Sequence, residues 1–203
     1  SHEIRTPLTR MKLGLENLPE GEDRQSLAED VTELESLVRE LLEGARLEAG
    51  ASPLKLERFD LVALLKEIAV DFKARQPGLD LELPSALILL ADPQRLRRLL
   101  QNLLNNAFVH GQPARGPVRL SLQAQAGQVL ISVEDQGPGL NEADRAQLFS
   151  PFFRADRSRT RSTGGLGLGL HLCRSIAKAH GGSLDAQAAT GGGLCLLLKL
   201  PLA

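Results

Sequence analysis

The first 50 residues alternate apolar and polar positions with the period of an α-helix. Apolar residues recur at steps of three or four, and charged residues fill the positions between them. A break at 17–21 separates two such stretches, so the pattern predicts a hairpin of two helices. The apolar stripes are formed by Ile4, Leu8, Met11, Leu15 and Leu18, and by Leu27, Val31, Leu34, Val38, Leu41 and Ala45.

A single hairpin leaves much of these stripes in water. Two hairpins paired as a four-helix bundle would bury them, so we expect a homodimer through residues 1–48. The alternative is that the stripes pack on the rest of the chain. Residues 50–53, Gly-Ala-Ser-Pro, are typical of a linker between the hairpin and a second domain.

Beyond the linker the period changes repeatedly between that of helices and that of strands. Asp60 and Asp92 are placed as N-caps, the second followed by Pro93, and Pro77-Gly78 is a stop signal. Strand pairs around Ala126-Gly127 and around 191–193 are expected to form hairpins. The pattern predicts helices at 60–76, 93–110 and 170–180, and strands at 79–83, 87–91, 118–124, 129–133, 183–188 and 194–200.

A glycine-rich segment runs directly into the last of these helices. Residues 163–170 read Thr-Gly-Gly-Leu-Gly-Leu-Gly-Leu. Glycines let backbone N–H groups approach a ligand, and a helix N-terminus behind them adds free N–H groups and a positive dipole end. The segment therefore suggests a phosphate site, although a flexible turn is the alternative. The polar stretch before it is no strand, so the usual dinucleotide arrangement is missing.

The predicted helix at 93–110 carries polar residues at a regular spacing. Asn102, Asn106 and His110 recur every four residues and share a face. Asparagine is a mediocre helix former, so two of them in mid-helix call for an explanation. Mg²⁺ binds amide oxygens together with phosphate oxygens, which makes this face a candidate metal site. The alternative is a solvated polar face.

The strand at 129–133 ends in an acidic, glycine-rich sequence. Asp135 is followed by Gly137 and Gly139, which leave room beside its carboxylate. Such a carboxylate could accept a hydrogen bond from an exocyclic amine such as that of adenine. A simple Asp-Gly turn is the alternative.

Basic residues crowd the stretch between a phenylalanine cluster at 149–153 and the glycines. Next to a phosphate site they suggest a mobile basic lid, and the alternative is a solvated loop. The basic residues are Arg154, Arg157, Arg159 and Arg161.

Near the chain start, His2 lies just off the first apolar stripe and is expected to be exposed. Glu3 could orient and deprotonate it as a nucleophile, and Thr6 shares its face. Pro7 should weaken the helix locally. An exposed histidine at a chain start can also simply be solvated.

Composition excludes several classes of function. The formal net charge is −1, and there are six Phe with no Tyr or Trp, so we expect no nucleic-acid partner. No apolar run approaches the roughly 20 residues of a membrane span, and no signal peptide is visible. We interpret the two cysteines, Cys173 and Cys195, as small buried residues. The chain starts inside an expected helix, so we expect a piece of a longer protein.

In this order, the motifs resemble the cytoplasmic core of sensor histidine kinases of two-component systems. The resemblance covers essentially the whole chain, and five weak motifs in the family's order are together very specific. The matching segments are residues 1–8 (SHEIRTPL, the H-box), 102–107 (NLLNNA, the N-box), 135–139 (DQGPG, the G1-box), 149–152 (FSPF, the F-box) and 165–170 (GLGLGL, the G2-box).

The resemblance implies an α+β fold in two parts. Residues 1–52 would form a dimeric dimerisation and phosphotransfer hairpin. Residues 53–203 would form an ATP-binding α/β two-layer sandwich, shared with chaperone-type ATPases. The implied cofactors are ATP and Mg²⁺, and the implied partner is a cognate response regulator. The fragment itself would be cytoplasmic without membrane contact, and the parent protein anchored in the bacterial inner membrane.

Family roles carry over onto the matching positions. His2 would accept the phosphoryl group, Glu3 would act as base, and Thr6 would position water for regulator dephosphorylation. Asn106, helped by Asn102, would hold Mg²⁺, and Asp135 would bind adenine. The remaining nucleotide-binding positions would be His110, Gly137, Gly139, Arg154, Gly165, Leu166, Gly167, Leu168 and Gly169.

Two departures from the family pattern matter. Three residues after Asn106 the family usually has Lys or Arg, and here it is Val109. We expect a lid arginine or Arg154 to replace it in part, with modest nucleotide affinity. The start at Ser1 leaves His2 near a helix end, which should weaken the dimer and autophosphorylation.

Three functions compete at this point. The first is an ATP-dependent histidine kinase that passes its phosphoryl group to a regulator aspartate, with regulator phosphatase activity as well. The second is a nucleotide-binding module without kinase activity that docks or dephosphorylates a regulator, as Val109 suggests. The third is an ATPase that uses hydrolysis for conformational work, against which the histidine-bearing hairpin argues.

Overall fold

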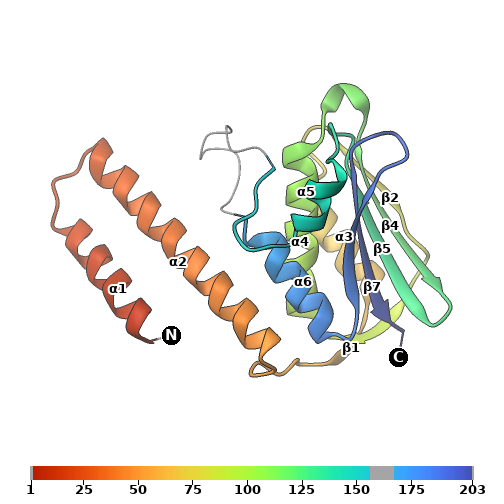
Figure 1. Cartoon of the computed structure of the whole chain (residues 1–203), viewed down its shortest axis with the longest axis horizontal. Coiled ribbons are helices and arrows are strands. Elements are labelled where there is room, and N and C mark those ends of the chain that lie inside the picture. The colour runs from red at the N-terminus through yellow and green to blue at the C-terminus, as the bar shows by residue number, and fades with distance from the viewer. Residues whose placement is uncertain (1, 156–166, 203) are drawn as a thin grey trace.

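A computed structural model describes residues 2–155 and 167–202. A helical hairpin comes first, and an α/β sandwich comes after it (Figure 1). The elements in chain order are α1 (His2–Glu16), α2 (Glu22–Glu48), β1 (Glu57–Asp60), α3 (Leu61–Val70), β2 (Leu79–Glu82), β3 (Ile88–Ala91), α4 (Pro93–His110), the 3-10 turn η1 (Pro113–Arg115), β4 (Val118–Gln125), β5 (Gln128–Glu134), α5 (Glu142–Gln147), α6 (Gly169–Ala179), β6 (Ser183–Ala188) and β7 (Leu194–Pro201).

The hairpin forms as the apolar stripes predict, and α1 continues through Pro7. Its stripes are only partly covered. Leu8 and Val31 are buried between the two helices, while Met11, Leu27 and Leu34 remain exposed. The C-terminal half of α2 packs on α6, so one part of the second stripe rests on the rest of the chain and the other part is open (Figure 1).

The sandwich consists of a five-stranded sheet with helices on one face. The strand order is β2-β4-β5-β7-β6, in which β2 runs parallel to β4 and the other neighbours are antiparallel. Alternate residues of β5, Val129, Ile131 and Val133, point into the core. Opposite them, α3, α4 and α6 contribute fully buried leucines and isoleucines, as expected for a two-layer arrangement.

Local signals in the sequence set most element boundaries. Asp60 accepts a hydrogen bond from Val62 N, and Asp92 accepts one from Arg95 N, so both cap their helices as predicted. The turn at Ala126-Gly127 has positive φ at both residues, which suits the tight β4–β5 hairpin.

The predicted helix at 60–76 is wrong at its C-terminal end. Helix α3 ends at Val70, and the next residues form tighter turns in which Phe72 N bonds to Ala69 O and Arg75 N bonds to Phe72 O. The tightening brings Phe72 into the core against Phe108, with ring centroids 5.1 Å apart. The sequence pattern also gave no sign of β1, which pairs antiparallel with β3, or of the short helix α5.

Candidate functional site

Helix α4 presents the asparagine face that its sequence predicts. Its leucines form the buried side, and Asn102 and Asn106 lie half-buried beside them, while His110 is exposed at the C-terminal end. The four-residue spacing places all three on one side of the helix. The two asparagines are thus partly covered, while the His110 end of this face is open to solvent.

The amide of Asn102 faces the beginning of α6. A Cβ added to Gly169 would lie 3.6 Å from Asn102 Nδ2. Within residues 2–155 and 167–202, no oxygen or nitrogen pairs with the buried Asn102 Nδ2, and the weakly accepting sulfur of Cys173 lies nearby. Leaving such a group unpaired costs about 1–3 kcal/mol. An orphaned amide is the kind of feature that a bound ligand or ion would complete.

The N-terminus of α6 lies next to this amide. The residue before the helix is Leu168, which is buried and supplies no side-chain cap. The first N–H groups of a helix without a capping side chain are available to an anion, and the helix dipole favours negative charge there. Asn102 and the start of α6 together form a site suited to phosphate.

The backbone of Gly167 explains one of the glycines. Its φ is +77°, and a Cβ at this position would come within 2.6 Å of Phe153 O. Its own carbonyl accepts a hydrogen bond from Phe152 N at 3.2 Å. Both the conformation and the close approach require glycine. Gly165 and Leu166, which the sequence also assigned to this site, lie outside the described residues, as do Arg157, Arg159 and Arg161.

Asp135 is a buried carboxylate at the end of β5. Only 3% of its surface is exposed, and its Oδ1 accepts bonds from Gly137 N at 2.7 Å and Leu194 N at 3.3 Å. Burial raises the pKa of this carboxyl, and the two backbone bonds and the charge of His110 act against that rise. Both backbone bonds engage Oδ1, so Oδ2 is the oxygen that a ligand would meet.

Two glycine turns close around this carboxylate. A Cβ at Gly137 would lie 2.8 Å from Asp135 Oδ1, and one at Gly139 would lie 3.1 Å from Gly193 O in the β6–β7 turn. The bond from Gly137 N makes Asp135 part of an Asp-Gly turn, as the simpler interpretation of the sequence expected. The turn and the buried, directed carboxylate are therefore the same feature, and the turn does not exclude a binding role.

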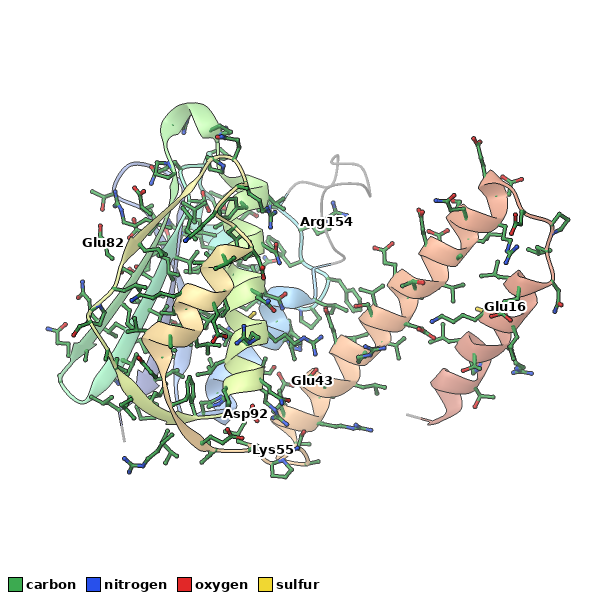
Figure 2. The ribbon with its side chains drawn as sticks, turned by 180° about the vertical axis from the view of Figure 1, so that it is seen from behind. Glu16, Glu43, Lys55, Glu82, Asp92 and Arg154 are labelled. Carbon is green, nitrogen blue, oxygen red and sulfur yellow. The ribbon has the colours of Figure 1, made fainter. Side chains whose placement is uncertain are left out.

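Arg154 is the last basic residue before residues 156–166, which lie outside the described part of the chain (Figure 2). Another arginine, which the sequence pattern did not single out, lies beside α4. Arg75 donates to Asn105 Oδ1 at 2.8 Å and stacks on the rings of Phe72 and Phe108. It comes from the turns after α3, and no spacing in the sequence relates it to α4. Val109, one turn beyond Asn105, is 40% exposed.

The phosphoacceptor candidates belong to α1. Thr6 is exposed on that helix, and the backbones of His2 and Glu3 form its first turn, while their side chains lie outside the described part of the structure. Helix α2 lies between α1 and the sandwich (Figure 1). The structure thus brings Asn102 to the start of α6 and Asp135 to the C-terminal end of α4, and it keeps the hairpin candidates apart from them.

The donor set fits Mg²⁺ held jointly with phosphate better than a metal site made by protein alone. Among the described residues there is no cluster of three or more His, Cys, Asp or Glu side chains that could hold a metal. The two asparagines supply amide oxygens, which suit a hard cation that keeps water or phosphate as its other ligands. The cysteines take no part, because burial raises the pKa of Cys173 to about 12 and that of Cys195 to about 11.

Hydrogen bonds that the sequence did not reveal also hold the linker after α2 against the start of α4. Asp92 accepts a bond from Lys55 N at 3.0 Å, and Arg95 donates to Ser52 Oγ at 2.7 Å (Figure 2 labels Asp92 and Lys55). His180, at the end of α6, accepts a bond from Asp92 N at 3.1 Å. Burial holds the pKa of His180 below its usual value. The first turn of α4 is thereby tied to the exit of α2.

Comparison with known proteins identifies a family for the hairpin and for most of the sandwich. Residues 91–203 match the family model described as "Histidine kinase-, DNA gyrase B-, and HSP90-like ATPase", and residues 1–50 match "His Kinase A (phospho-acceptor) domain". Sensor protein RstB of Escherichia coli is 37% identical over 208 residues, which cover 100% of this chain and 47% of that protein. Sensor histidine kinase MtrB of Mycolicibacterium paratuberculosis is 34% identical and is covered over 38% of its length.

Solved structures give the same result. Full-length ShkA in complex with AMPPNP superposes with a TM-score of 0.79 at 33% identity, over 100% of this chain and 44% of that one. The histidine kinase AdeS of Acinetobacter baumannii superposes with a TM-score of 0.73 at 26% identity, over 100% of this chain and 98% of that one.

The chain spans less than half the length of the curated relatives RstB and MtrB. Within its described residues, no helix combines the length and the apolar composition that crossing a bilayer demands. The two family models match residues 1–50 and 91–203, and the structure places the asparagine face of α4 beside the start of α6. The chain therefore belongs to the sensor histidine kinases of two-component systems.

Proposed function

We propose that this chain binds ATP with Mg²⁺, phosphorylates its own His2 and passes the phosphoryl group to an aspartate of a cognate response regulator. The observation that carries the proposal is the site between α4 and α6. There a buried asparagine amide adjoins an uncapped helix N-terminus, and the buried carboxylate of Asp135 lies near His110, at the C-terminal end of α4. A nucleotide offers a partner for each of them: phosphates for the first two and an amine for the third.

In this proposal Asp135 recognises the adenine base of ATP. Its Oδ2 accepts from the exocyclic amine of adenine, and the Asp135–Gly137 turn gives the ring space. Gly139 and His110 lie beside the same turn. The phosphates lie on the N-terminus of α6, where the proposed contacts are Gly165, Leu166, Gly167, Leu168 and Gly169. Arg154 approaches from the lid.

The metal would be held by Asn106, with Asn102 beside it. Bound Mg²⁺ would neutralise charge on the phosphates and fix their orientation. The rest of the work falls to the chain's own groups. Asn102 and the α6 amides hold the phosphates in place, and positioning of this kind supplies much of the catalysis of phosphoryl transfer.

On the hairpin, an imidazole nitrogen of His2 would form the new P–N bond while the bond from the γ-phosphorus to the bridging oxygen breaks and ADP leaves. Glu3 would take the imidazole proton. Thr6 would position water for the reverse task, dephosphorylation of the regulator. Because α2 separates α1 from the sandwich, the sandwich has to move, or to serve the partner chain, before transfer occurs (Figure 1).

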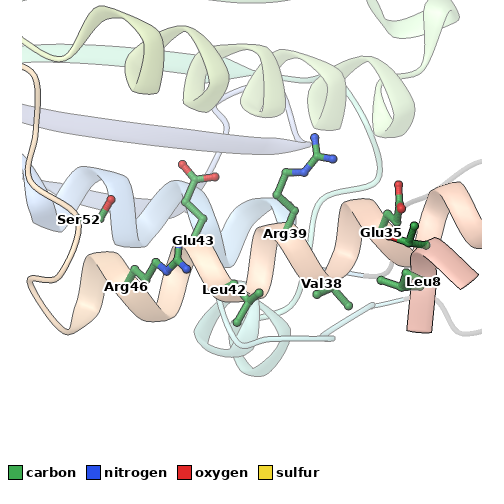
Figure 3. Close-up of a pocket in the computed structure, with 9 residues that line it drawn as sticks. Leu8, Glu35, Val38, Arg39, Leu42, Glu43, Arg46 and Ser52 are labelled. Carbon is green, nitrogen blue, oxygen red and sulfur yellow. The ribbon is translucent and has the colours of Figure 1, made fainter. Parts of the chain in front are cut away.

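We assign residues 1–52 to the dimerisation and phosphotransfer domain and residues 53–203 to the catalytic domain. A groove on the hairpin supports dimerisation through residues 1–48. Its apolar lining is Leu8, Val38 and Leu42, and Val38 and Leu42 project from the side of α2 opposite α4 (Figure 3). A second hairpin would cover this lining together with the exposed residues of the stripes.

The same family membership supports placing this core in the cytoplasm, with a parent protein anchored in the bacterial inner membrane. The missing cation at Val109 supports a modest nucleotide affinity. Arg154, the other lid arginines and Arg75 are the candidates to offset it, since Arg75 already bonds to the neighbouring Asn105.

Val109 also favours one alternative, a nucleotide-binding module that docks or dephosphorylates a regulator without being a kinase. A single experiment separates the two. The protein is incubated with γ-phosphate-labelled ATP and Mg²⁺, alongside His2→Gln, and the product is treated with acid and with alkali. Label that acid removes, alkali spares and His2→Gln lacks supports the kinase. Nucleotide binding without label supports the module.

A further inference from the structure

The side chain of His171 connects two parts of the molecule that are distant in sequence. It projects from the first turn of α6, and only 18% of it is exposed. Its Nδ1 lies 3.2 Å from Phe149 O, and its Nε2 lies 3.8 Å from Glu48 Oε1 on α2. A Cβ at Gly44 would come within 3.6 Å of the same Nε2, so α2 approaches the ring closely.

The two ring nitrogens have different tasks. A carbonyl oxygen can only accept, so Nδ1 carries the hydrogen that is donated to Phe149 O. Nε2 is then the atom that faces Glu48, and it pairs with this carboxylate in the protonated ring, in which both nitrogens carry a hydrogen. The carboxylate is held from a second side, because Ser175 Oγ donates to Glu48 Oε1 at 3.0 Å. Ser175 is itself buried on α6, so the position of Glu48 relative to this helix is well defined.

Phe149 O stands at the base of the segment that leads to the glycines. Ser150 N bonds to Gln147 O, and Phe153 N bonds to Ser150 O. Phe152 N bonds to Gly167 O, and Phe152 has the unusual φ of +63°. A residue other than glycine keeps such a conformation only when its surroundings hold it there. The bond from His171 is one of the contacts that fix this segment.

We propose that His171 is a positioning residue that couples the docking of α2 to the order of the nucleotide loop. With Glu48 in place, the ring is oriented so that Nδ1 holds Phe149 O, and residues 149–154 are arranged for nucleotide. Coupling between two sites is reciprocal, so nucleotide in turn strengthens the docking of α2. The coupling rests on the proposed nucleotide site, whereas the contact itself does not.

The same interface provides a matched control. Arg98 of α4 forms ion pairs with Glu43 and Glu40 of α2, and Glu43 points toward the helices of the sandwich (Figure 3). These pairs also hold α2 on the sandwich, but Arg98 lies on α4 and the loop is held from α6. Glu43→Ala therefore weakens docking without removing the carboxylate that faces the ring of His171.

Two substitutions separate the two nitrogens. In His171→Asn the side-chain amide can replace Nδ1 toward Phe149 O, but it does not reach Glu48. In His171→Gln the longer amide can replace Nε2 toward Glu48 and gives up the bond to Phe149 O. The readouts are hydrogen exchange of the Phe152 and Phe153 amides without nucleotide and the affinity for a non-hydrolysable ATP analogue.

We expect Glu48→Ala and His171→Gln to speed exchange of these amides and to weaken the analogue, each by about threefold to tenfold, the range that loss of one hydrogen bond gives. Glu43→Ala should speed exchange at these amides less than Glu48→Ala does, because Glu48 remains beside the ring. His171→Asn should keep them protected, and adding Glu48→Ala to His171→Asn should have no further effect.

Equal effects of Glu48→Ala and Glu43→Ala, or full sensitivity of His171→Asn to Glu48→Ala, would overturn the coupling. Exchange with the expected pattern in a protein that binds no ATP analogue would leave the contact standing and remove the proposed nucleotide site. Tight analogue binding that none of the variants alters would support the nucleotide site and remove the coupling through His171.

Discussion

Asp135 allows the sharpest test of the nucleotide site, because its two oxygens have different partners. Oδ1 accepts from Gly137 N and Leu194 N, and the proposed ligand contact uses Oδ2. Asp135→Asn keeps an oxygen for the two backbone amides and replaces Oδ2 by an NH₂ group. The fold should therefore survive. Its free energy of unfolding should change little, since burial already disfavours the charged carboxylate.

Binding should respond much more strongly. A hydrogen bond to a charged group contributes about 1.5–3 kcal/mol, which corresponds to roughly a tenfold to 150-fold loss of affinity for an ATP analogue. The new NH₂ group would also face the adenine amine. Both groups donate hydrogen bonds, so neither could accept one from the other. GTP carries an oxygen at the equivalent position of its base, so the preference for ATP over GTP should narrow.

The assay is calorimetric titration of wild type and Asp135→Asn with ATP and GTP analogues, with urea unfolding as the control for stability. Asp135→Ala is the comparison that removes both roles. It leaves two buried N–H groups unpaired at about 1–3 kcal/mol each, so it should lower stability as well as binding. If Asp135→Asn folds and keeps both its affinity and its preference for ATP, the assignment of Oδ2 to the base is refuted.

Three further predictions concern a loop glycine, the hairpin surface and a buried histidine. Gly167→Ala should weaken analogue binding, because the left-handed backbone costs about 1–2 kcal/mol and the new Cβ meets Phe153 O. Gly14→Ala, in open space on α1, should instead raise the free energy of unfolding by about 0.5–1 kcal/mol. Equal effects of the two substitutions on urea unfolding would contradict this prediction. Leu34→Arg should shift the protein from dimer to monomer in analytical ultracentrifugation, since it places a charge on the exposed stripe, whereas Leu81→Arg on β2 should not. The pKa of His180 in the folded protein lies below its ordinary 6.5, so its contribution to stability is present above pH 6.5 and is lost as the pH falls through the folded pKa. Urea unfolding midpoints should therefore drop from pH 7 towards pH 5 in wild type, and less so in His180→Gln. The same pH dependence of the midpoint in both proteins would show that this ring is not the cause.

Local patterns in the sequence account for most of the secondary structure. The apolar stripes at three- and four-residue steps predicted α1, α2 and α4, and Asp60 and Asp92 fixed two helix starts, because capping involves only neighbouring residues. Alternation predicted the two long β-hairpins for the same reason. The end of α3 was misplaced because the packing of Phe72 on Phe108, a contact across 36 positions, decides it. Strand β1 was missed because it is short and depends on its pairing with β3, which lies about 30 positions away in the chain.

For the site, the sequence by itself determined the types of residue and their order, namely the asparagine spacing, the acidic residue before glycines and the glycine segment before a helix. Tertiary structure decided which of them meet. It brought Asn102 to Gly169, buried Asp135 under the β6–β7 turn, and placed His171 between Phe149 and Glu48. Periodicity records which face of an element is buried and not what buries it. Contacts between elements far apart in the chain depend on the packing of the whole core.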